Sequence, residues 1–319
     1  MRSSRPRLLA VLLACCAALL MSPMSASAAR TGPVVDSAWA ALWTAVLTPS
    51  AAPKGANDWN CKPTAEHPRP VILLHGTYSN LLANFSNLAL PLKREGYCVF
   101  GRNYGSYPYG LGVFPAIKGL ASLRSSSREI SGFVDRVLRE TGAEQVDLVG
   151  FSQGGLVARA YLRYDGGANP ADPSKNKVHS LIGLNSANHG GTAWGLTDWV
   201  RWFQKWKQVR DIWGPSSVDL TEGSPFLQQL NTGDQTVPGV EYTMIGTQLD
   251  EISLPYTKAF LTPGPGATVR NITIQDGCPK DLSDHFTLPF SKRAHGLVLQ
   301  ALDPAYPSSK IPCAINLPL

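Results

Sequence analysis

The segment over residues 146–164 constrains the fold of this chain more than any other feature. An apolar run at 146–149 leads into Gly-Phe-Ser-Gln-Gly at 150–154, and a helix-forming stretch follows directly. In a tight turn between a strand and a helix, a serine flanked in this way by glycines stands above the strand end, where a substrate carbonyl can reach its hydroxyl. The alternative is a serine that only caps the helix start. The strand–turn–helix setting favours Ser152 as a nucleophile.

Apolar runs elsewhere in the chain alternate with runs of helical periodicity. The clearest helix has apolar residues at i, i+3, i+4, i+7 and i+8, namely Ile130, Phe133, Val134, Val137 and Leu138, and Gly142 marks its end. Further helices are predicted at 39–47, 84–93 and 292–302. Strands are predicted at 71–74, 97–100, 146–149, 179–184, 240–245 and 269–274. Continuous apolar strands that alternate with helices predict an α/β fold with a mostly parallel central sheet and helices on both faces.

The beginning of the chain is typical of a secretory signal. Three arginines precede an apolar run over 8–21, and Ala-Ser-Ala at 26–28 supplies small residues for cleavage. The apolar run is shorter than the roughly 20 residues that span a bilayer. A lipoprotein signal at Cys15 fits less well, because apolar residues continue directly after it. We therefore expect a signal peptide over 1–28, one domain over 29–319 and a secreted protein.

Charge and composition argue against several classes of protein. Lys and Arg number 29 against 23 Asp and Glu, and three arginines leave with the signal, so the remaining balance is 26 − 23 = +3. Without a run of basic residues, no nucleic-acid partner is expected. No later apolar segment is long enough for a transmembrane helix. No cluster of Asp, Glu or His has the spacing of metal ligands, so we expect no metal. We also expect a monomer without another cofactor.

Four cysteines follow the signal segment, at Cys61, Cys98, Cys278 and Cys313. An even number in an exported chain predicts two disulfides, and three pairings are open. Sequential pairing would close segments of 98 − 61 = 37 and 313 − 278 = 35 positions. Each such bond would stabilise the fold by roughly 3–4 kcal/mol in the chain-entropy model.

A serine nucleophile requires a histidine base and an acid that orients the histidine. Where the serine sits in such a turn, the acid and then the histidine follow it in the chain. His285 and His295 come late enough after Ser152 to leave room for the acid. His295 falls inside a helical pattern, whereas His285 lies in a loop that follows a predicted strand. His285 is therefore the predicted base.

Asp250 is the predicted acid. It follows the strand predicted at 240–245, and the loop that leaves the carboxyl end of a parallel strand lies at the same sheet edge as Ser152. Its short side chain suits the orienting role. The rival carboxylates are Glu251, Asp234 and Asp276.

Acyl transfer also needs donors for the developing oxyanion, each worth roughly 2.7–4 kcal/mol. The N–H of Gln153, directly after the nucleophile, is one predicted donor. The N–H of Thr77, in the turn after the strand at 71–74, is the other, and the Thr77 hydroxyl is a candidate for a further hydrogen bond. His75 precedes the nucleophile in the chain, so we interpret it as a structural residue that braces the turn.

Five of the eight tryptophans lie between residues 194 and 213. Apolar side chains recur there on one helical face, at Trp199, Trp202, Phe203, Trp206, Val209 and Trp213. One interpretation is a cap or lid inserted over 194–232, whose aromatic face meets lipid or lines an acyl pocket. The other is an amphipathic helix packed on the core. The sequence leaves both open.

Four segments then carry a resemblance to known proteins: LLHGT at 73–77, GFSQGG at 150–155, YTMIGTQLDEISLPY at 242–256 and QDGCPKDLSDH at 275–285. In these segments the chain resembles secreted actinobacterial lipases of the α/β-hydrolase superfamily. The same order is similar to fungal lipase B of the Candida antarctica type. The resemblance covers about residues 59–313.

The resemblance implies an α/β-hydrolase fold with Ser152 as nucleophile, Asp250 as acid and His285 as base. It implies Thr77 and Gln153 as oxyanion donors. It further implies two disulfides, Cys61–Cys98 and Cys278–Cys313. The chain departs from many lipases at Phe151, where they have His or Trp before the nucleophile, and this change affects the shape of the pocket.

The expected function is that of a serine carboxylic-ester hydrolase, a lipase similar to triacylglycerol lipases, with an acyl-enzyme intermediate. Its partner would be a lipid or small ester, including substrate at a lipid–water interface. A polyester depolymerase or an acyltransferase would use the same three residues. A non-catalytic lipid-binding protein of the same fold is the alternative from another class, and the complete residue set argues against it.

Overall fold

A parallel sheet forms the centre of the structure, a computed structural model that describes residues 31–191 and 205–319. Its strands are β1 (Val71–Leu74), β2 (Val99–Gly101), β3 (Val146–Phe151), β4 (Val178–Leu184), β5 (Glu241–Gly246) and β6 (Thr268–Thr273). They lie in the order β2-β1-β3-β4-β5-β6, and each neighbouring pair is parallel. The parallel sheet predicted from the sequence is confirmed, with strand ends shifted by at most two residues.

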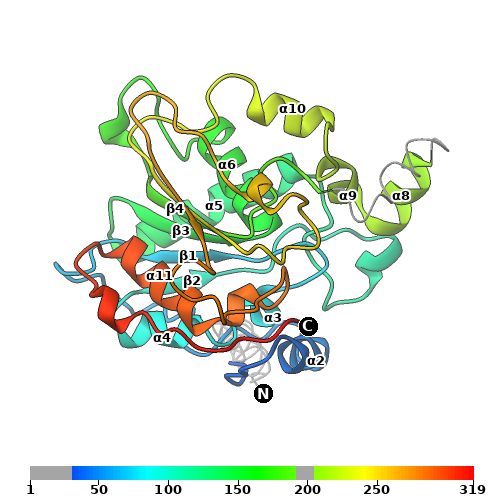
Figure 1. The fold of residues 1–319 in the computed structure, drawn as a ribbon. Helices are drawn as coiled ribbons and strands as arrows, with labels where there is room; N and C mark the ends of the chain where they lie inside the picture. Colours follow the sequence, from blue (N-terminus) through cyan, green and yellow to red (C-terminus); the bar gives the residue numbers. More distant parts are fainter. Residues whose placement is uncertain (1–30, 192–204) are drawn as a thin grey trace, which may run out of the picture.

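Helices cover both faces of this sheet (Figure 1). The α-helices are α2 (Ala38–Leu47), α3 (Leu81–Phe85), α4 (Ala89–Arg94), α5 (Leu123–Thr141), α6 (Gln153–Tyr164), α8 (Trp206–Trp213), α9 (Pro215–Asp219), α10 (Pro225–Asn231) and α11 (Lys292–Leu302). Short 3-10 helices are η1 (Gly110–Val113), η2 (Pro173–Lys175), η4 (Tyr256–Ala259), η5 (Leu288–Phe290) and η6 (Ser308–Lys310). Of these helices, α5, α6 and α10 pack on one face, and α3, α4 and α11 pack on the other.

The core therefore has two apolar layers, one on each side of the sheet. Alternate residues of β1 face opposite layers: Ile72 and Leu74 pack with α5 and α6, while Val71 and Leu73 pack with α3, α4 and α11. All four side chains are fully buried. Burial on both faces explains why the strands are uninterrupted apolar runs in the sequence.

Helix α5 confirms the clearest periodic pattern. Its predicted apolar face is buried at Ile130, Phe133, Val134 and Val137. Gly142 ends the helix in the left-handed conformation, at φ 79°, and its N–H donates to the Leu138 carbonyl.

The single helix predicted over 84–93 is wrong, because the chain forms two short helices there, α3 and α4. The cause is Pro91, which has no N–H and whose ring would clash with the Asn87 carbonyl in a continuous helix. In the structure Pro91 instead lies in the first turn of a new helix, where a missing N–H costs nothing.

Two disulfides join cysteines in sequential order, Cys61 to Cys98 and Cys278 to Cys313. The first ties the segment before β1 to the start of β2, and the second ties the loop after β6 to the C-terminal tail. Among residues 31–191 and 205–319, none of the helices combines the length and apolar character that crossing a bilayer requires.

The Cys61–Cys98 bond should contribute measurably to stability. It closes a segment of 37 positions, for which the chain-entropy model gives about 3–4 kcal/mol. We expect the double variant Cys61→Ala/Cys98→Ala to lose about this much free energy of unfolding in urea titrations. A loss below about 1 kcal/mol would show that the unfolded chain is already restricted without the bond.

Candidate active site

Ser152 lies in the turn between β3 and α6, as the sequence predicts. Its backbone has φ 52° and ψ −119°, in a region that side chains other than glycine rarely adopt. The two flanking glycines make the turn sterically feasible. A Cβ on Gly150 would lie 2.5 Å from the Gly155 nitrogen, and one on Gly154 would lie 2.0 Å from the Leu74 carbonyl oxygen.

Gly154→Ala should therefore disrupt this turn, because its Cβ would meet backbone that cannot move without shifting β1. We expect a loss of about 3 kcal/mol or more in the free energy of unfolding. Gly132→Ala is a matched control. It lies inside α5 with no atom within 4 Å of an added Cβ, and it should stabilise the protein by about 0.5–1 kcal/mol. Equal effects in urea unfolding would contradict this steric account.

The structure brings Ser152, His285 and Asp250 together at the carboxyl edge of the sheet. The Ser152 Oγ lies 3.0 Å from His285 Nε2, and His285 Nδ1 lies 3.0 Å from Asp250 Oδ1. His285 is 3% exposed and Asp250 is 1% exposed. Since Nδ1 faces a carboxylate, it carries the proton, which leaves the Nε2 lone pair directed at the serine hydroxyl.

Backbone groups hold the Asp250 carboxylate in place. Its Oδ1 accepts the N–H groups of Ile252 and Ser253, both at 2.9 Å, in the loop that leaves β5. These donors fix the side chain toward His285. Its Oδ2 is buried and has no protein partner among the described residues.

The loop that carries His285 is held from two sides. The Glu251 Oε2 accepts the backbone N–H of His285 at 2.9 Å, and the Asn185 amide donates to the His285 carbonyl at 3.3 Å. Burial raises the pKa of the Glu251 carboxyl. The Phe151 ring packs against the imidazole, with centroids 5.3 Å apart. The sequence predicts Glu251 only as an alternative acid, because no local sequence pattern shows that its side chain contacts a loop 34 residues away.

Thr77 and Gln153 also lie side by side. The Thr77 hydroxyl donates to the Gln153 Oε1 at 2.6 Å, so here it is directed at the glutamine and not at an oxyanion. Gln153 is the first residue of α6, and first-turn N–H groups have no acceptor within their own helix. A helix N-terminus directly after the nucleophile favours a developing negative charge.

The other histidines near these elements have structural partners. His75 is fully buried at the end of β1, where its Nε2 accepts the Tyr104 N–H at 3.2 Å and its Nδ1 donates to the Gly76 carbonyl at 2.8 Å. His295 lies inside α11 and donates from Nε2 to the Pro289 carbonyl at 2.7 Å. Burial lowers the pKa of each to about 4.

The remaining sequence candidates do not join this site. Asp234 and Asp276 are exposed on loops. Among the described residues, neither forms a hydrogen bond with His285. Within residues 31–191 and 205–319, no group of three or more His, Cys, Asp or Glu could hold a metal ion.

Three of the six residues on the apolar helical face predicted over 199–213 lie outside the described residues: Trp199, Trp202 and Phe203. Trp206 begins α8, a helix with no buried residue. The described part of this face is thus not packed in the core, since Trp213 is exposed at the far end of the same helix. Figure 1 shows α8 standing away from the central sheet.

The chain matches the model of a known protein family. The model of the family described as "Lipase (class 2)" matches residues 68–262, which include Ser152 and Asp250, while His285 lies beyond the match. No curated protein matches the chain.

Solved structures share the fold at low sequence identity. Aspergillus fumigatus lipase B superposes with a TM-score of 0.58 at 19% identity, over 81% of this chain and 60% of that one. Bacillus licheniformis lipase BlEst2 in its mature form gives a TM-score of 0.50 at 16% identity, over 75% of this chain and 94% of that one. This chain thus spans about three fifths of the Aspergillus protein. These similarities confirm the α/β-hydrolase fold, and by the match over residues 68–262 the chain belongs to the class 2 lipase family.

Proposed function

We propose that the chain is a secreted serine lipase or esterase that uses Ser152, His285 and Asp250 through an acyl-enzyme intermediate. One observation carries the proposal: two hydrogen bonds of 3.0 Å link the three side chains in the order that proton transfer needs. The two disulfides support an oxidising compartment, in line with the expected signal segment.

In the proposed first half-reaction, the Ser152 Oγ forms a bond to the ester carbonyl carbon while its proton passes to His285 Nε2. The carbonyl oxygen becomes an oxyanion, which the N–H groups of Thr77 and Gln153 stabilise. The carbon–oxygen bond to the leaving group then breaks, and the alcohol leaves with the proton from His285. The acyl group remains on Ser152.

In the second half-reaction, a water molecule gives its proton to His285 Nε2 as its oxygen bonds to the acyl carbon. The new oxyanion collapses, the bond to Ser152 breaks, and His285 returns the proton to the serine oxygen. The carboxylic acid is released. Asp250 keeps its charge throughout and stabilises the imidazolium that forms in each half.

The test uses residues 29–319 with p-nitrophenyl esters from two to sixteen carbons and a fluorophosphonate inhibitor. We expect ester hydrolysis, and inhibition that parallels one covalent label on the peptide that contains Ser152. An added alcohol acceptor and a polyester film separate hydrolysis from acyl transfer and depolymerisation. Lipid binding without hydrolysis or labelling would overturn the proposal and favour a non-catalytic lipid-binding protein.

A further inference from the structure

The loop that carries His285, here called the base loop (residues 281–287), lies between two segments that run parallel to it. On one side it pairs with the residue before Asp250, and on the other side it pairs with Asn316 of the tail (residues 311–319). Of these two neighbours, only the segment with Asp250 has a role in the proposed reaction. The tail is the second support of the same loop.

The tail keeps one register along the base loop. Contacts at three positions share the same spacing: the disulfide Cys278–Cys313, the pairing of Asp281 with Asn316, and the hydrogen bond of 2.6 Å from the Leu319 N–H to the Asp284 Oδ2. In each pair the two residues are 35 positions apart, since 316 − 281 = 35 equals the separation within the other two. A parallel pairing keeps one offset in this way. The register therefore extends to the residue directly before His285.

Asn316 contacts the base loop with both its backbone and its side chain. Its carbonyl accepts the Leu282 N–H at 2.9 Å. Its amide donates to the Ser283 Oγ at 2.8 Å and to the Thr287 carbonyl at 3.1 Å. A carbonyl can only accept, so the NH₂ group of the amide faces the loop. Because Ser283 and Thr287 lie two residues before and two residues after His285, this one side chain spans the base.

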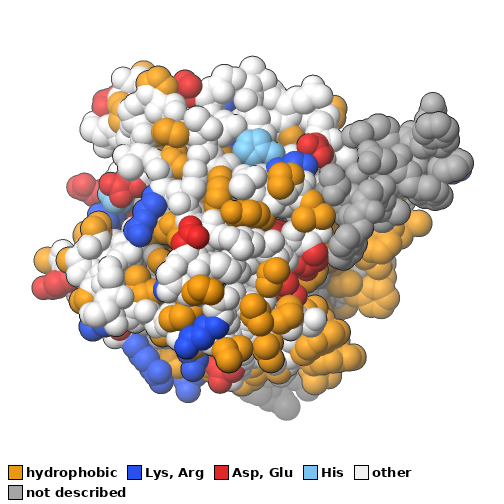
Figure 2. Space-filling view, in the orientation of Figure 1, with side chains coloured by type: hydrophobic (Ala, Val, Ile, Leu, Met, Phe, Trp, Pro, Cys, Tyr) orange, Lys and Arg blue, Asp and Glu red, His pale blue; other side chains and the backbone are white. Residues whose placement is uncertain are grey.

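The neighbours of Asn316 in the tail are directed away from the loop. Asn316 is half-buried, whereas Ile315 is 67% exposed and Leu317 is 64% exposed. Figure 2 shows hydrophobic side chains gathered on the part of the surface where α2 and the end of the tail lie. Side chains of an extended segment alternate in direction, which explains this pattern. The polar Asn316 side chain, and not its apolar neighbours, thus joins the tail to the base loop.

The hydrogen bonds of Asn316 continue into the interior. The Ser283 hydroxyl, which accepts from Asn316, donates to the Asp281 carboxylate. The other oxygen of that carboxylate accepts the Ser291 hydroxyl at 2.6 Å. Asp281 is fully buried. A connected polar network of this kind fixes the positions of its members, since a displaced member would leave a buried group unpaired.

We propose that Asn316 is a positioning residue for the base His285, and that the Cys278–Cys313 disulfide keeps it in register. The inference rests on the proposed function and adds a residue to its site. Catalysis depends on two hydrogen bonds of 3.0 Å from opposite sides of the imidazole. A displacement of about 1 Å at a reacting group can lower a rate by about 10²-fold, even when the altered residue lies away from the substrate.

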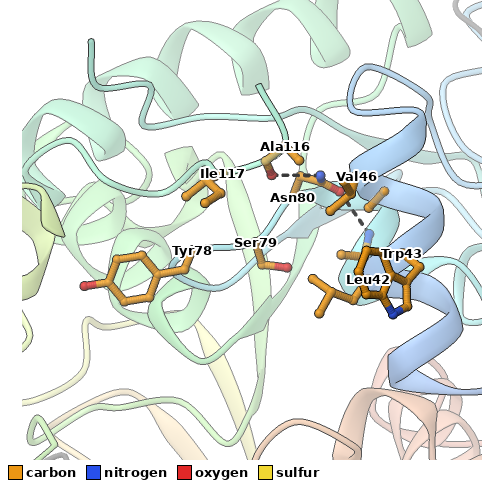
Figure 3. Close-up of a pocket in the computed structure, with 10 residues that line it drawn as sticks. Leu42, Trp43, Val46, Tyr78, Ser79, Asn80, Ala116 and Ile117 are labelled. Atoms are coloured by element: carbon orange, nitrogen blue, oxygen red, sulfur yellow. Dashed lines mark hydrogen bonds between the residues drawn. The ribbon is translucent and has the colours of Figure 1, made fainter. Parts of the chain in front are cut away.

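The oxyanion side of the site is held independently of the tail. Close to Thr77, the Asn80 amide donates to the Ala116 carbonyl at 2.9 Å, beside the pocket drawn in Figure 3. The Lys118 N–H donates to the Ser79 carbonyl at 3.0 Å and joins the same two segments. Loss of the tail contacts should therefore displace the base without displacing this donor.

The first test measures kcat and KM for p-nitrophenyl butyrate. We expect Asn316→Ala to lower kcat by about 10- to 100-fold. KM should change little, because His285 acts in both half-reactions and both slow together. Asn316→Asp keeps the shape of the side chain but places a carboxylate oxygen against the Thr287 carbonyl, so its loss should be at least as large. Leu317→Ala, in the next residue of the tail, is the matched control and should keep full kcat. Full activity in both Asn316 variants would overturn the proposal.

A double variant shows whether Asn316 acts through the base. In His285→Ala/Asn316→Ala, kcat should be no lower than in His285→Ala alone, because the group that Asn316 positions is already missing. A general loss of folded protein would instead lower the activity of the double variant further. Such a further loss would overturn the assignment to His285.

The two disulfides provide a comparison that does not depend on whether Asn316→Ala folds. Cys278→Ala/Cys313→Ala and Cys61→Ala/Cys98→Ala open segments of 35 and 37 positions, so their urea midpoints should fall by similar amounts. Only the first should also lower kcat, by about tenfold. Equal kcat in the two would overturn the role of the tail. Failure of the proposed function would instead appear as no hydrolysis of butyrate by the unmodified protein.

Discussion

Replacing Ser152 by alanine is expected to lower kcat for p-nitrophenyl butyrate by about 10⁶, the loss seen when a triad nucleophile is removed. The variant keeps the oxyanion donors but has no oxygen to form the acyl-enzyme. The residual rate would come from substrate binding and oxyanion stabilisation alone.

Two controls make this result specific. His285→Ala should cost about as much as Ser152→Ala, and the double variant should cost no more than either, because the pair acts as a unit across its 3.0 Å hydrogen bond. Thermal unfolding should show that both variants fold. A loss below tenfold, or a fluorophosphonate label that persists in Ser152→Ala, would exclude Ser152 as the nucleophile.

Replacing Asp250 by alanine is expected to lower kcat by about 10⁴. The carboxylate is the group that fixes the His285 tautomer and stabilises its protonated form, and both functions end with the side chain. The affinity for substrate should change little, since Asp250 is buried behind the histidine. Steady-state kinetics over a range of butyrate concentrations measures kcat and KM separately.

Asp250→Asn separates the two functions of the acid. Its amide oxygen can still accept the N–H groups of Ile252 and Ser253 and the His285 Nδ1 proton, but it carries no charge. We expect kcat to fall by about 10⁴, as in Asp250→Ala, because the charge that stabilises the imidazolium is lost. Asp276→Asn, on an exposed loop, should leave kcat unchanged. A large effect at Asp276, or none at Asp250, would reassign the acid.

Local sequence patterns predicted the elements of the fold closely. Helix α11 has the bounds expected from its pattern, and each strand overlaps its predicted run. These patterns succeed because burial on both sheet faces requires continuous apolar strands, and burial of one helix face requires a 3.6-residue period. The prediction of one helix over 84–93 failed because Pro91 interrupts the backbone hydrogen bonds of a continuous helix.

The sequence by itself determined the turn at Ser152, since the steric limit at Gly150 acts against Gly155, five residues along the chain. The sequence also limited the candidate bases to two histidines and the candidate acids to four carboxylates. Only the tertiary structure brought one candidate base and one candidate acid to the serine. His285 is 133 residues from Ser152 in the chain, and the order of the strands in the sheet places the two side by side. The position of Glu251 likewise depends on how distant loops pack, and packing of distant segments leaves no periodic trace in the sequence.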